Sequence, residues 1–462
     1  MPSGKSGYAL NHTQPNLTDS TFARIYTFAC EFEIKTPAVT ELLNNNSRVP
    51  LLLFEPISKL LRISSTVSTI KFSRVVRKTF LLPFVLLFLF FVLAIRPIFS
   101  IQVISLPYNF GDLLFCVHYF ESINETWNKR HRKKRLALYC AYGKITNALV
   151  SEKLSHKVAL ISGDLAWLIW KIFRIVPNTV VKHNEFKDPI PEFLDCLLTF
   201  TKSEEMIGSQ ILENTERNFI CLNVRDSAYD HHLGRSENFI RKIRNSNIDD
   251  YKGAIEYLVN NDILVFRMGL AVEKTIEIIN TNFIDYASNG LRTELLDIFL
   301  GAKCKFAVST GSGWDAIPEM FKRPILEVNV FDCYRPMNLA RKQIAFPKIF
   351  WSIEKGRPLT LCELIELFHS GVLTLKLSSP EKIGLKIRDL SSEELLDAVR
   401  EMVQRVDGIF VETPEQKEMQ AKAKYILSNH PKLQPSPNYF PVRLEFASCF
   451  LSRYPNFLDG LD

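Results

Sequence analysis

The sequence lacks the short motifs by which several common classes of protein are recognised. It contains no Cys-x-x-Cys pair, no Walker-type glycine loop and no Gly-x-Gly-x-x-Gly. A zinc site, a P-loop and the usual dinucleotide-binding fingerprint are therefore not expected. The nine cysteines are odd in number, scattered and mostly set inside apolar runs. They predict buried free thiols in a reducing compartment and no disulfide framework.

The sequence also lacks a large excess of one charge. The formal net charge is +7 over 462 residues, and we find neither the recognition motif nor the concentrated basic face of a nucleic-acid-binding protein. An anionic substrate or an anionic membrane surface suits this balance better. No internal repeat or low-complexity tract occurs. The chain is too long for one ordinary core, so two or three structural units are expected.

No apolar run reaches the roughly 20 residues that a membrane-spanning helix needs. The longest, Phe80–Ile95, has basic residues on both sides. Three interpretations are open: a monotopic or re-entrant anchor, a single spanning helix, and a buried core helix. We favour the anchor, and expect a membrane-associated protein on the cytoplasmic face.

The order of expected elements predicts an α/β protein. Strand-like Ile98–Leu106 precedes helix-like Leu113–Glu121, and strand Phe219–Val224 opens a clearer alternation that ends with Ile325–Val330. Such βαβ succession predicts parallel, doubly wound sheets. The expected segments are a polar and amphipathic extension (1–70), a membrane-associated segment (71–96), a first Rossmann-like domain (97–213), a second Rossmann-like domain (214–390) and C-terminal helices (391–462).

Sequence signals for helix starts are clearest in the C-terminal part. Ser391 with Glu394, and Thr413 with Gln416, have the spacing of capping boxes ahead of helices. We expect a last helix over Val442–Leu451. Before the second domain, Pro191–Glu213 also has mostly helical character.

Two segments of the second domain carry the chemistry. Strand Phe306–Val308 is followed by a turn of small and hydroxyl residues and then a helix, while strand Phe219–Val224 is followed by an arginine–aspartate pair. Backbone amides at glycines and helix starts bind phosphates, and a guanidinium suits a diphosphate. The candidate donor-binding residues are Arg225, Asp226, Arg267, Gly269, Ser309, Thr310, Gly311, Ser312 and Gly313. A plain strand–helix turn and a structural ion pair are the alternatives.

In the first domain, Gly111 and Asp112 stand where a strand turns into a helix. The Asp112 carboxylate could take a proton from an acceptor hydroxyl as general base. It could equally be a first-turn acid that stabilises the helix dipole. His231 and His232 lack a convincing third ligand, so no metal site is expected.

Several stretches resemble a family of inferred glycosyltransferases from bacterial surface-polysaccharide gene clusters. The resemblance covers residue 95 to the end. It is carried by Phe219–Tyr229, Arg244–Ser246, Phe266–Gly269, Ile284–Tyr286, Asp297–Leu300, Cys304–Phe306, Ser309–Gly313, Phe346–Trp351 and Arg357–Thr360. It implies a GT-B-like fold of two Rossmann-type domains with parallel sheets facing a cleft, donor on the C-terminal domain and acceptor on the N-terminal one. The strand ending at Arg225 is similar to fucosyltransferase-like sites where arginine meets the diphosphate.

We therefore expect a metal-independent glycosyltransferase that needs no cofactor. Its substrates would be a nucleotide-sugar donor and a glycan or lipid-linked acceptor, with Asp112 and Arg225 as the catalytic residues. The missing Asp-x-Asp argues against a metal-chelating transferase of the single-sheet kind. Two alternatives stay open. One is a non-catalytic glycan- or lipid-binding protein on the same frame, and the other is an epimerase or pyruvyltransferase acting on a sugar nucleotide.

Overall fold

The computed structural model describes residues 74–97, 99–106, 110–141, 147–182, 196–212, 218–236, 238–332, 343–373, 377, 379–433 and 442–460. The chain divides into two compact units, Met1–Leu81 and Leu82–Asp462, and the strands of the described residues lie in the second. The predicted extension 1–70 lies outside the described residues. The predicted domain boundaries stay predictions.

The first sheet is parallel, with strand order β3-β2-β1-β4. Its elements, with the helix that precedes them, are α4 (Arg74–Ile95), β1 (Phe99–Leu106), α5 (Phe110–Arg130), β2 (Lys134–Ala141), α6 (Ala148–Ser155), β3 (Ala159–Ser162), α7 (Gly163–Phe173) and β4 (Val180–Lys182). The inner halves of β1 and β2 are buried. This order is that of the first four strands of a Rossmann fold.

The second sheet has seven parallel strands in the order β14-β10-β9-β8-β5-β6-β7. Its strands are β5 (Phe219–Asn223), β6 (Leu264–Arg267), β7 (Phe283–Ile284), β8 (Ala307–Ser309), β9 (Ile325–Val330), β10 (Ile344–Pro347) and β14 (Glu445–Phe446). Counted from β5, the order is 3-2-1-4-5-6 plus one edge strand, the doubly wound order that binds ligands where it reverses. The two sheets confirm the predicted α/β class with two Rossmann-type units.

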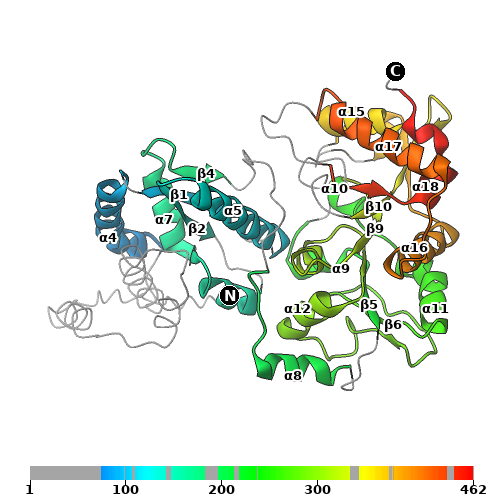
Figure 1. The fold of residues 1–462 in the computed structure, drawn as a ribbon, viewed down its shortest axis with the longest axis horizontal. Helices are drawn as coiled ribbons and strands as arrows, with labels where there is room; N and C mark the ends of the chain where they lie inside the picture. Colours follow the sequence, from blue (N-terminus) through cyan, green and yellow to red (C-terminus); the bar gives the residue numbers. More distant parts are fainter. Residues whose placement is uncertain are drawn as a thin grey trace, which may run out of the picture. The chain divides into compact units, whose positions relative to one another are not determined.

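Helices precede, separate and follow the strands of the second sheet. They are α8 (Lys202–Gln210), α9 (Ala228–His232), α10 (Phe239–Lys242), η1 (Ile248–Tyr251), α11 (Lys252–Asn260), α12 (Glu294–Lys303), η2 (Gly313–Asp315), α13 (Ala316–Met320), α15 (Leu361–His369), η3 (Pro380–Ile383), α16 (Ser392–Val406), α17 (Pro414–Asn429), α18 (Ser448–Arg453) and η4 (Pro455–Leu458). A small antiparallel sheet joins β12 (Arg357–Pro358), β11 (Ile349–Ser352) and β13 (Leu385–Arg388). Figure 1 labels most of these elements.

Several local predictions can be compared with the structure. The capping boxes at Ser391 and Thr413 are both present and begin α16 and α17. The predicted helix over Val442–Leu451 is wrong in its first half, because Glu445 and Phe446 pair with β10 as the edge strand β14 and the helix begins only at Ser448. Burial of Phe446 against the sheet decides this, since its side chain has no exposed surface.

The predicted helix Pro191–Glu213 falls partly outside the described residues. Within them, residues 196–200 are not helical and α8 begins at Lys202. The Thr201 side chain accepts from the backbone N of Glu204, while Glu204 accepts from the backbone N of Thr201. This capping box fixes the start of the helix. The seven cysteines among the described residues are free, as predicted.

Candidate functional site

The candidate site lies where the strand order of the second sheet reverses. There β5 and β8 are neighbours in parallel register, with Asn223 opposite Ser309. From β5 the chain continues to β6 on one side, and from β8 it continues to β9 on the other, and ligands of doubly wound sheets bind at such a reversal of strand order. The sequence placed Arg225 and the glycine turn in separate strand-end loops, and the structure brings these loops together.

Three hydrogen bonds tie the two loops to each other. The backbone N of Arg225 donates to Thr310 Oγ1 at 3.0 Å, and the Thr310 N donates to Asn223 O at 3.2 Å. Asn223 Nδ2 donates to Ser312 Oγ at 2.6 Å. Asn223 therefore holds the glycine turn against β5.

Some donors of the glycine turn are already used within the protein. The Ser312 N donates to Asp315 Oδ2 at 2.7 Å, and the Trp314 N donates to Ser312 Oγ at 3.1 Å, so the start of η2 is capped by its own residues. The amides of Gly311 and Gly313 donate no hydrogen bond in the part of the chain that the structure describes. Gly311 has φ +77°, the left-handed region that favours glycine. Two amides thus remain available to an anion.

Ser309 is the last residue of β8 and is completely buried. Its hydroxyl has no hydrogen-bond partner among the described residues. Because Ser309 is buried while Gly311 and Gly313 are partly or fully exposed, the open part of the turn is its glycine-containing end.

The Arg225 guanidinium is held by the protein itself. Nη2 forms an ion pair with Asp230, and Nη1 donates to Asn245 Oδ1 at 3.4 Å. Burial, followed by the positive charge of Arg244, lowers the pKa of Arg225. The Asp230 carboxylate also lies 3.7 Å from Arg235 and 3.8 Å from Arg241. Three guanidinium groups, those of Arg225, Arg235 and Arg241, therefore lie around one carboxylate beside this edge of the sheet.

Arg244 is a site residue that strand-end reasoning missed. Its Nη2 donates to the carbonyl oxygen of Gly311 at 2.8 Å, so Arg244 is the arginine whose guanidinium reaches the glycine turn. The segment that carries it is fixed nearby, because the Ser246 N donates to Arg225 O at 2.8 Å. The only sequence signal was the place of Arg244–Ser246 in the family resemblance, since this segment follows α10 and not a strand.

A buried lysine, Lys348, contacts the segment that carries Arg244. Lys348 Nζ donates to Asn245 O at 3.0 Å and forms an ion pair with Asp389. Ser246 Oγ donates to Asp389 Oδ2 at 3.3 Å. Burial lowers the pKa of Lys348, although Asp389 opposes that shift. These contacts fix the loop between α10 and η1 relative to the second sheet.

Two other predicted site residues, Asp226 and Arg267, have their polar groups bound by the protein itself. Asp226 accepts from the backbone N of Ala228 at 3.0 Å and of Glu273 at 2.9 Å, so its carboxylate organises two loops. Arg267 has no exposed surface, and its Nη1 donates to Asp285 Oδ2 at 3.0 Å and to Lys274 O at 2.8 Å. In this conformation it presents no atom to a ligand.

Gly269 follows Arg267 in the loop after β6. A Cβ at this position would lie 2.9 Å from Val272 Cγ1 and 3.3 Å from Ala287 Cβ. The missing side chain therefore lets the loop after β6 pack closely on itself and on the segment that follows β7. The residue has no contact with the glycine turn among those that the structure gives.

The amino-terminal end of α5 abuts the glycine turn. A Cβ at Gly111 would lie 2.3 Å from Gly313 O and 2.4 Å from Gly313 Cα, so only glycine allows this approach of the two backbones. Asp112 is the next residue, in the first turn of α5, and is exposed. The structure thus brings the predicted base beside the predicted phosphate turn.

A second contact joins a helix next to the first sheet, α6, to a helix next to the second sheet, α12. Glu294, the first residue of α12, accepts from the backbone N of Ala148 at 3.2 Å and of Leu149 at 3.0 Å, which are the first amides of α6. Burial raises the pKa of Asp297, one turn along α12, to about 6. Both residues lie in the first turn of α12, and neither points to catalysis here.

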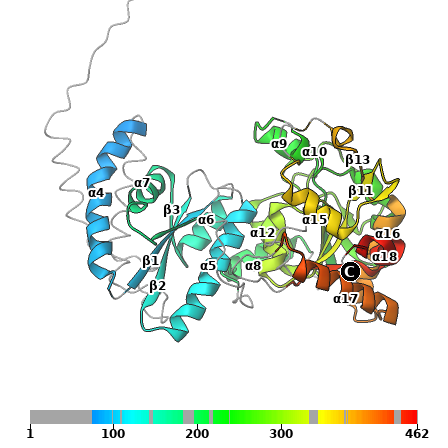
Figure 2. The same ribbon diagram turned by 90° about the horizontal axis from the view of Figure 1, so that it is seen from above.

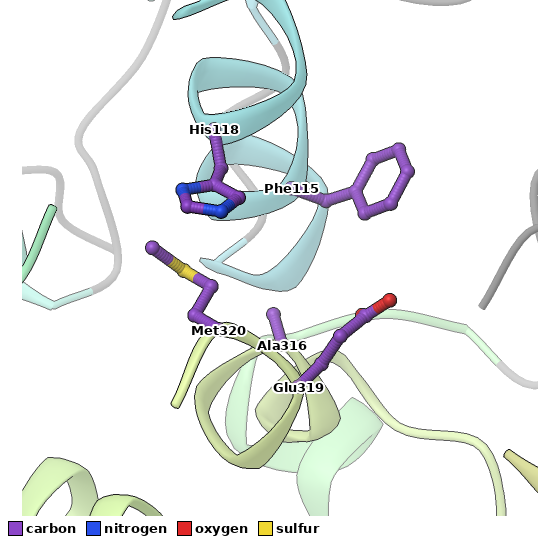
Figure 3. A pocket seen from close by; sticks show the side chains of 5 residues that line it. All are labelled: Phe115, His118, Ala316, Glu319 and Met320. Atoms are coloured by element: carbon purple, nitrogen blue, oxygen red, sulfur yellow. The ribbon is translucent and has the colours of Figure 1, made fainter. Parts of the chain in front are cut away.

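Figure 3 shows where α5 and α13 meet. Phe115 and His118 of α5 and Ala316, Glu319 and Met320 of α13 line a hollow of about 10 Å³. That space is no larger than a single water molecule requires. His118 is therefore part of a packed helix contact in this conformation.

Comparisons with known proteins give only distant likenesses. No family model and no curated protein matches the sequence. Solved structures that are similar include a family 9 glycosyl transferase from Veillonella parvula DSM 2008, with 9% identity and a TM-score of 0.40, covering 66% of this chain and 97% of that one. A second is the ADP-heptose LPS heptosyltransferase II of E. coli, with 12% identity and a TM-score of 0.34, covering 66% and 100%.

A third is the dodecameric iron-containing heptosyltransferase TibC in complex with ADP-D-β-D-heptose. It has 10% identity and a TM-score of 0.31, covering 52% of this chain and 61% of that one. Likenesses at this level place no ligand and no activity on this chain. The function has to be argued from the geometry of its own site.

Proposed function

We propose that the protein is a glycosyltransferase that uses a nucleotide-sugar donor and a glycan or lipid-linked acceptor. The observation that carries the proposal is the position of the glycine turn and its arginines at the point where the strand order reverses, between β5 and β8. Ligands of doubly wound sheets bind at that point. The free amides of Gly311 and Gly313, with Arg244 beside them, suit the diphosphate of such a donor.

In this proposal the protein stabilises the leaving nucleoside diphosphate by fixed positive charge. Arg244 and the two glycine amides meet the phosphates, and Arg225 adds a charge that Asp230 and Asn245 keep in place. Such preorganised groups act most strongly where negative charge develops in the transition state. Guanidinium groups can do here what a divalent cation does in other transferases, which supports a metal-independent reaction.

Asp112 is the proposed general base. It is exposed at the start of α5, one residue from the backbone contact between Gly111 and Gly313. An acceptor hydroxyl bound against α5 would therefore lie near a sugar whose phosphates occupy the glycine turn. We place the reaction on the cytoplasmic membrane face, in the synthesis of a surface polysaccharide. An inverting and a retaining course are both compatible with one carboxylate at this position.

The experiment is a thermal-shift titration with nucleoside diphosphates, because a bound ligand raises the melting temperature by mass action. The unmodified protein should be stabilised, and Arg244→Gln should weaken the apparent affinity about ten- to hundred-fold, as expected for losing a hydrogen bond to a charged group. Arg400→Gln is the matched control, since Arg400 is half exposed on α16. Equal nucleoside diphosphate affinities of the two variants would contradict the proposed binding site.

Product analysis then separates the proposal from its rivals. Mass spectrometry of an acceptor glycan incubated with a donor should show a product longer by one sugar. A donor that is isomerised, or that gains a pyruvyl group, would instead indicate an epimerase or a pyruvyltransferase. Binding of glycan with no response to any nucleotide would indicate a binding module.

A further inference from the structure

Helix α4 has an apolar surface on two opposite sides. Val85, Phe88 and Val92 are buried, with at most 4% of each side chain exposed, whereas Leu87 is 70% and Phe90 is 72% exposed. The exposed stripe consists of Leu82, Leu86, Leu87, Phe90 and Leu93. The 22 residues of α4 include no aspartate or glutamate. A contiguous apolar stripe of this size marks an interaction surface.

The buried side of α4 packs against α7 and the segment after it. The ring centroids of Phe88 and Phe173, on α7, are 5.7 Å apart, and Arg96 Nη2 donates to Pro177 O at 2.7 Å. Figures 1 and 2 both show α4 lying beside α7. These contacts fix the carboxyl-terminal half of α4 along a water-exposed α/β unit.

Because one side of α4 packs on α7, two orientations of α4 in a membrane, spanning and in-plane, can be compared. By length and composition, Val76–Ile95 could cross a membrane. A spanning orientation would draw α7 and its charged residues Lys171 and Arg174 toward the hydrocarbon, where such side chains are costly. A helix lying in the interface meets no such cost, because only its exposed stripe enters the lipid.

The neighbouring helix α7 carries residues that are typical of a membrane interface. Trp167, Trp170, Lys171 and Arg174 follow the i, i+3, i+4, i+7 spacing of one helix face, and Ile175 beyond them is 73% exposed. Lys171 Nζ lies 5.6 Å and 5.2 Å from the two indole rings, and Arg174 lies 4.9 Å from that of Trp170. Tryptophan anchors at the headgroup level, and basic residues attract anionic lipid.

We propose that the exposed stripe of α4 and the Trp167–Ile175 face of α7 together form a monotopic docking surface for an anionic lipid bilayer. The apolar stripe enters the acyl region, and the tryptophans and cations lie among the headgroups. The charge supports this occupant, because α4 and the Trp167–Ile175 face include no acid, and Asp164, the one acid of α7, lies in its first turn. No residue of the candidate site lies on α4 or α7, so membrane attachment and donor binding can fail independently.

The first test is co-sedimentation of the full chain with vesicles of phosphatidylcholine and phosphatidylglycerol in equal amounts. Leu87→Asp with Phe90→Asp should reduce binding at least ten-fold. Ile409→Asp with Val411→Asp is the matched control, because these side chains are 68% and 80% exposed far along the chain. The melting temperature of the unliganded protein should be nearly the same in both double variants, which shows that they are folded. Equal vesicle binding by the two double variants would refute the proposal.

The second test addresses the charge of the lipid. Lys171→Gln with Arg174→Gln should weaken binding to the anionic vesicles by roughly five-fold per charge, the equivalent of about 1 kcal/mol for each basic residue near an anionic surface. Binding to phosphatidylcholine alone should not change. Lys417→Gln with Lys424→Gln removes the same charge from exposed positions of α17 and should have no effect. An equal loss of vesicle binding in both double variants would show that α7 is not part of the docking surface.

The third test distinguishes an in-plane helix from a spanning one. Single cysteines replace Lys78 and Pro97, near the two ends of α4. The protein is added from outside to sealed vesicles and treated with a membrane-impermeant maleimide, with the unmodified chain as the labelling background. An in-plane helix leaves both new thiols reactive. Protection of one of the two until the vesicles are opened would show a spanning helix and overturn the proposal.

Discussion

The contact between Gly111 and Gly313 is the most sensitive point of the proposed site. Replacing Gly111 by alanine places a Cβ 2.3 Å from the Gly313 carbonyl oxygen and 2.4 Å from its Cα. Both are backbone atoms, so no rotamer relieves the overlap. The start of α5 must move away from the glycine turn by at least about 1 Å to restore an ordinary contact distance. Overpacking of this kind costs about 1–3 kcal/mol of stability.

The effect on turnover should be larger than the effect on stability. A displacement of 1 Å between reacting groups can reduce the rate about hundred-fold, and here it would separate Asp112 from the bound donor. Nucleotide affinity should change little, because Arg244 and Gly311 stay together. Steady-state kinetics with a saturating donor and a parallel thermal-shift titration measure the two effects separately.

Two further alanine variants make this a graded series. Gly313→Ala brings its Cβ to 3.2 Å from the Gly111 N, a milder conflict, whereas a Cβ at Gly253 in α11 meets nothing within 4 Å. Gly253→Ala should leave turnover unchanged and stabilise the fold by about 0.5–1 kcal/mol, since glycine is unfavourable inside a helix. Turnover of Gly111→Ala equal to that of Gly253→Ala would refute the view that α5 contributes to the reaction.

Two other predictions concern the supports of the fold. Lys348→Met removes the partner of Asp389 and the donor to Asn245 O; it should cost about 1–3 kcal/mol in chemical denaturation and weaken nucleotide affinity, because Arg244 loses its support. For Glu394, burial alone would raise the pKa, but hydrogen bonds from Arg388 and other donors outweigh it and lower the pKa to about 2. Its contribution is therefore complete above the pKa of the unfolded chain and is lost as the pH falls from about 4.5 toward 2. Glu394→Gln should reduce stability at neutral pH by about 1–3 kcal/mol and flatten its decline over that acid range, and an unchanged decline would contradict the assignment.

Much of the fold could be predicted because buried parallel strands leave a strong pattern. The alternation of strand-like and helix-like segments from Phe219 to Val330 predicted the second sheet. Its strands from β5 to β9 lie within a few residues of the predicted ones. Short strands such as β3 and β4 were missed, since three or four residues carry too little pattern. The strand β14 was missed for another reason. Its two residues are a strand only because β10 offers an open edge.

The site could be predicted only in part, and the reason is geometric. The carboxyl ends of neighbouring parallel strands share one edge, so Arg225 and the glycine turn could be expected to meet. The burial of Arg267 could not be foreseen, because its partner Asp285 follows a different strand. Arg244 could not be located either, since its loop returns to the sheet edge only after α9 and α10 have formed.

The two arginines beside the glycine turn have different roles, and this leads to a last prediction. Arg225 is 9% exposed and paired with a buried carboxylate, so redirecting it to a ligand would break an ion pair inside the protein. Arg244 is held by a carbonyl hydrogen bond, which contributes about 1–2 kcal/mol and is easily exchanged for a phosphate. Arg225→Gln should therefore lower the melting temperature, with loss of nucleotide affinity as a consequence of the disturbed loop. Arg244→Gln should lower affinity while leaving the melting temperature of the unliganded protein nearly unchanged. The reverse pattern in a thermal-shift titration would make Arg225 the ligand-binding group and Arg244 its support.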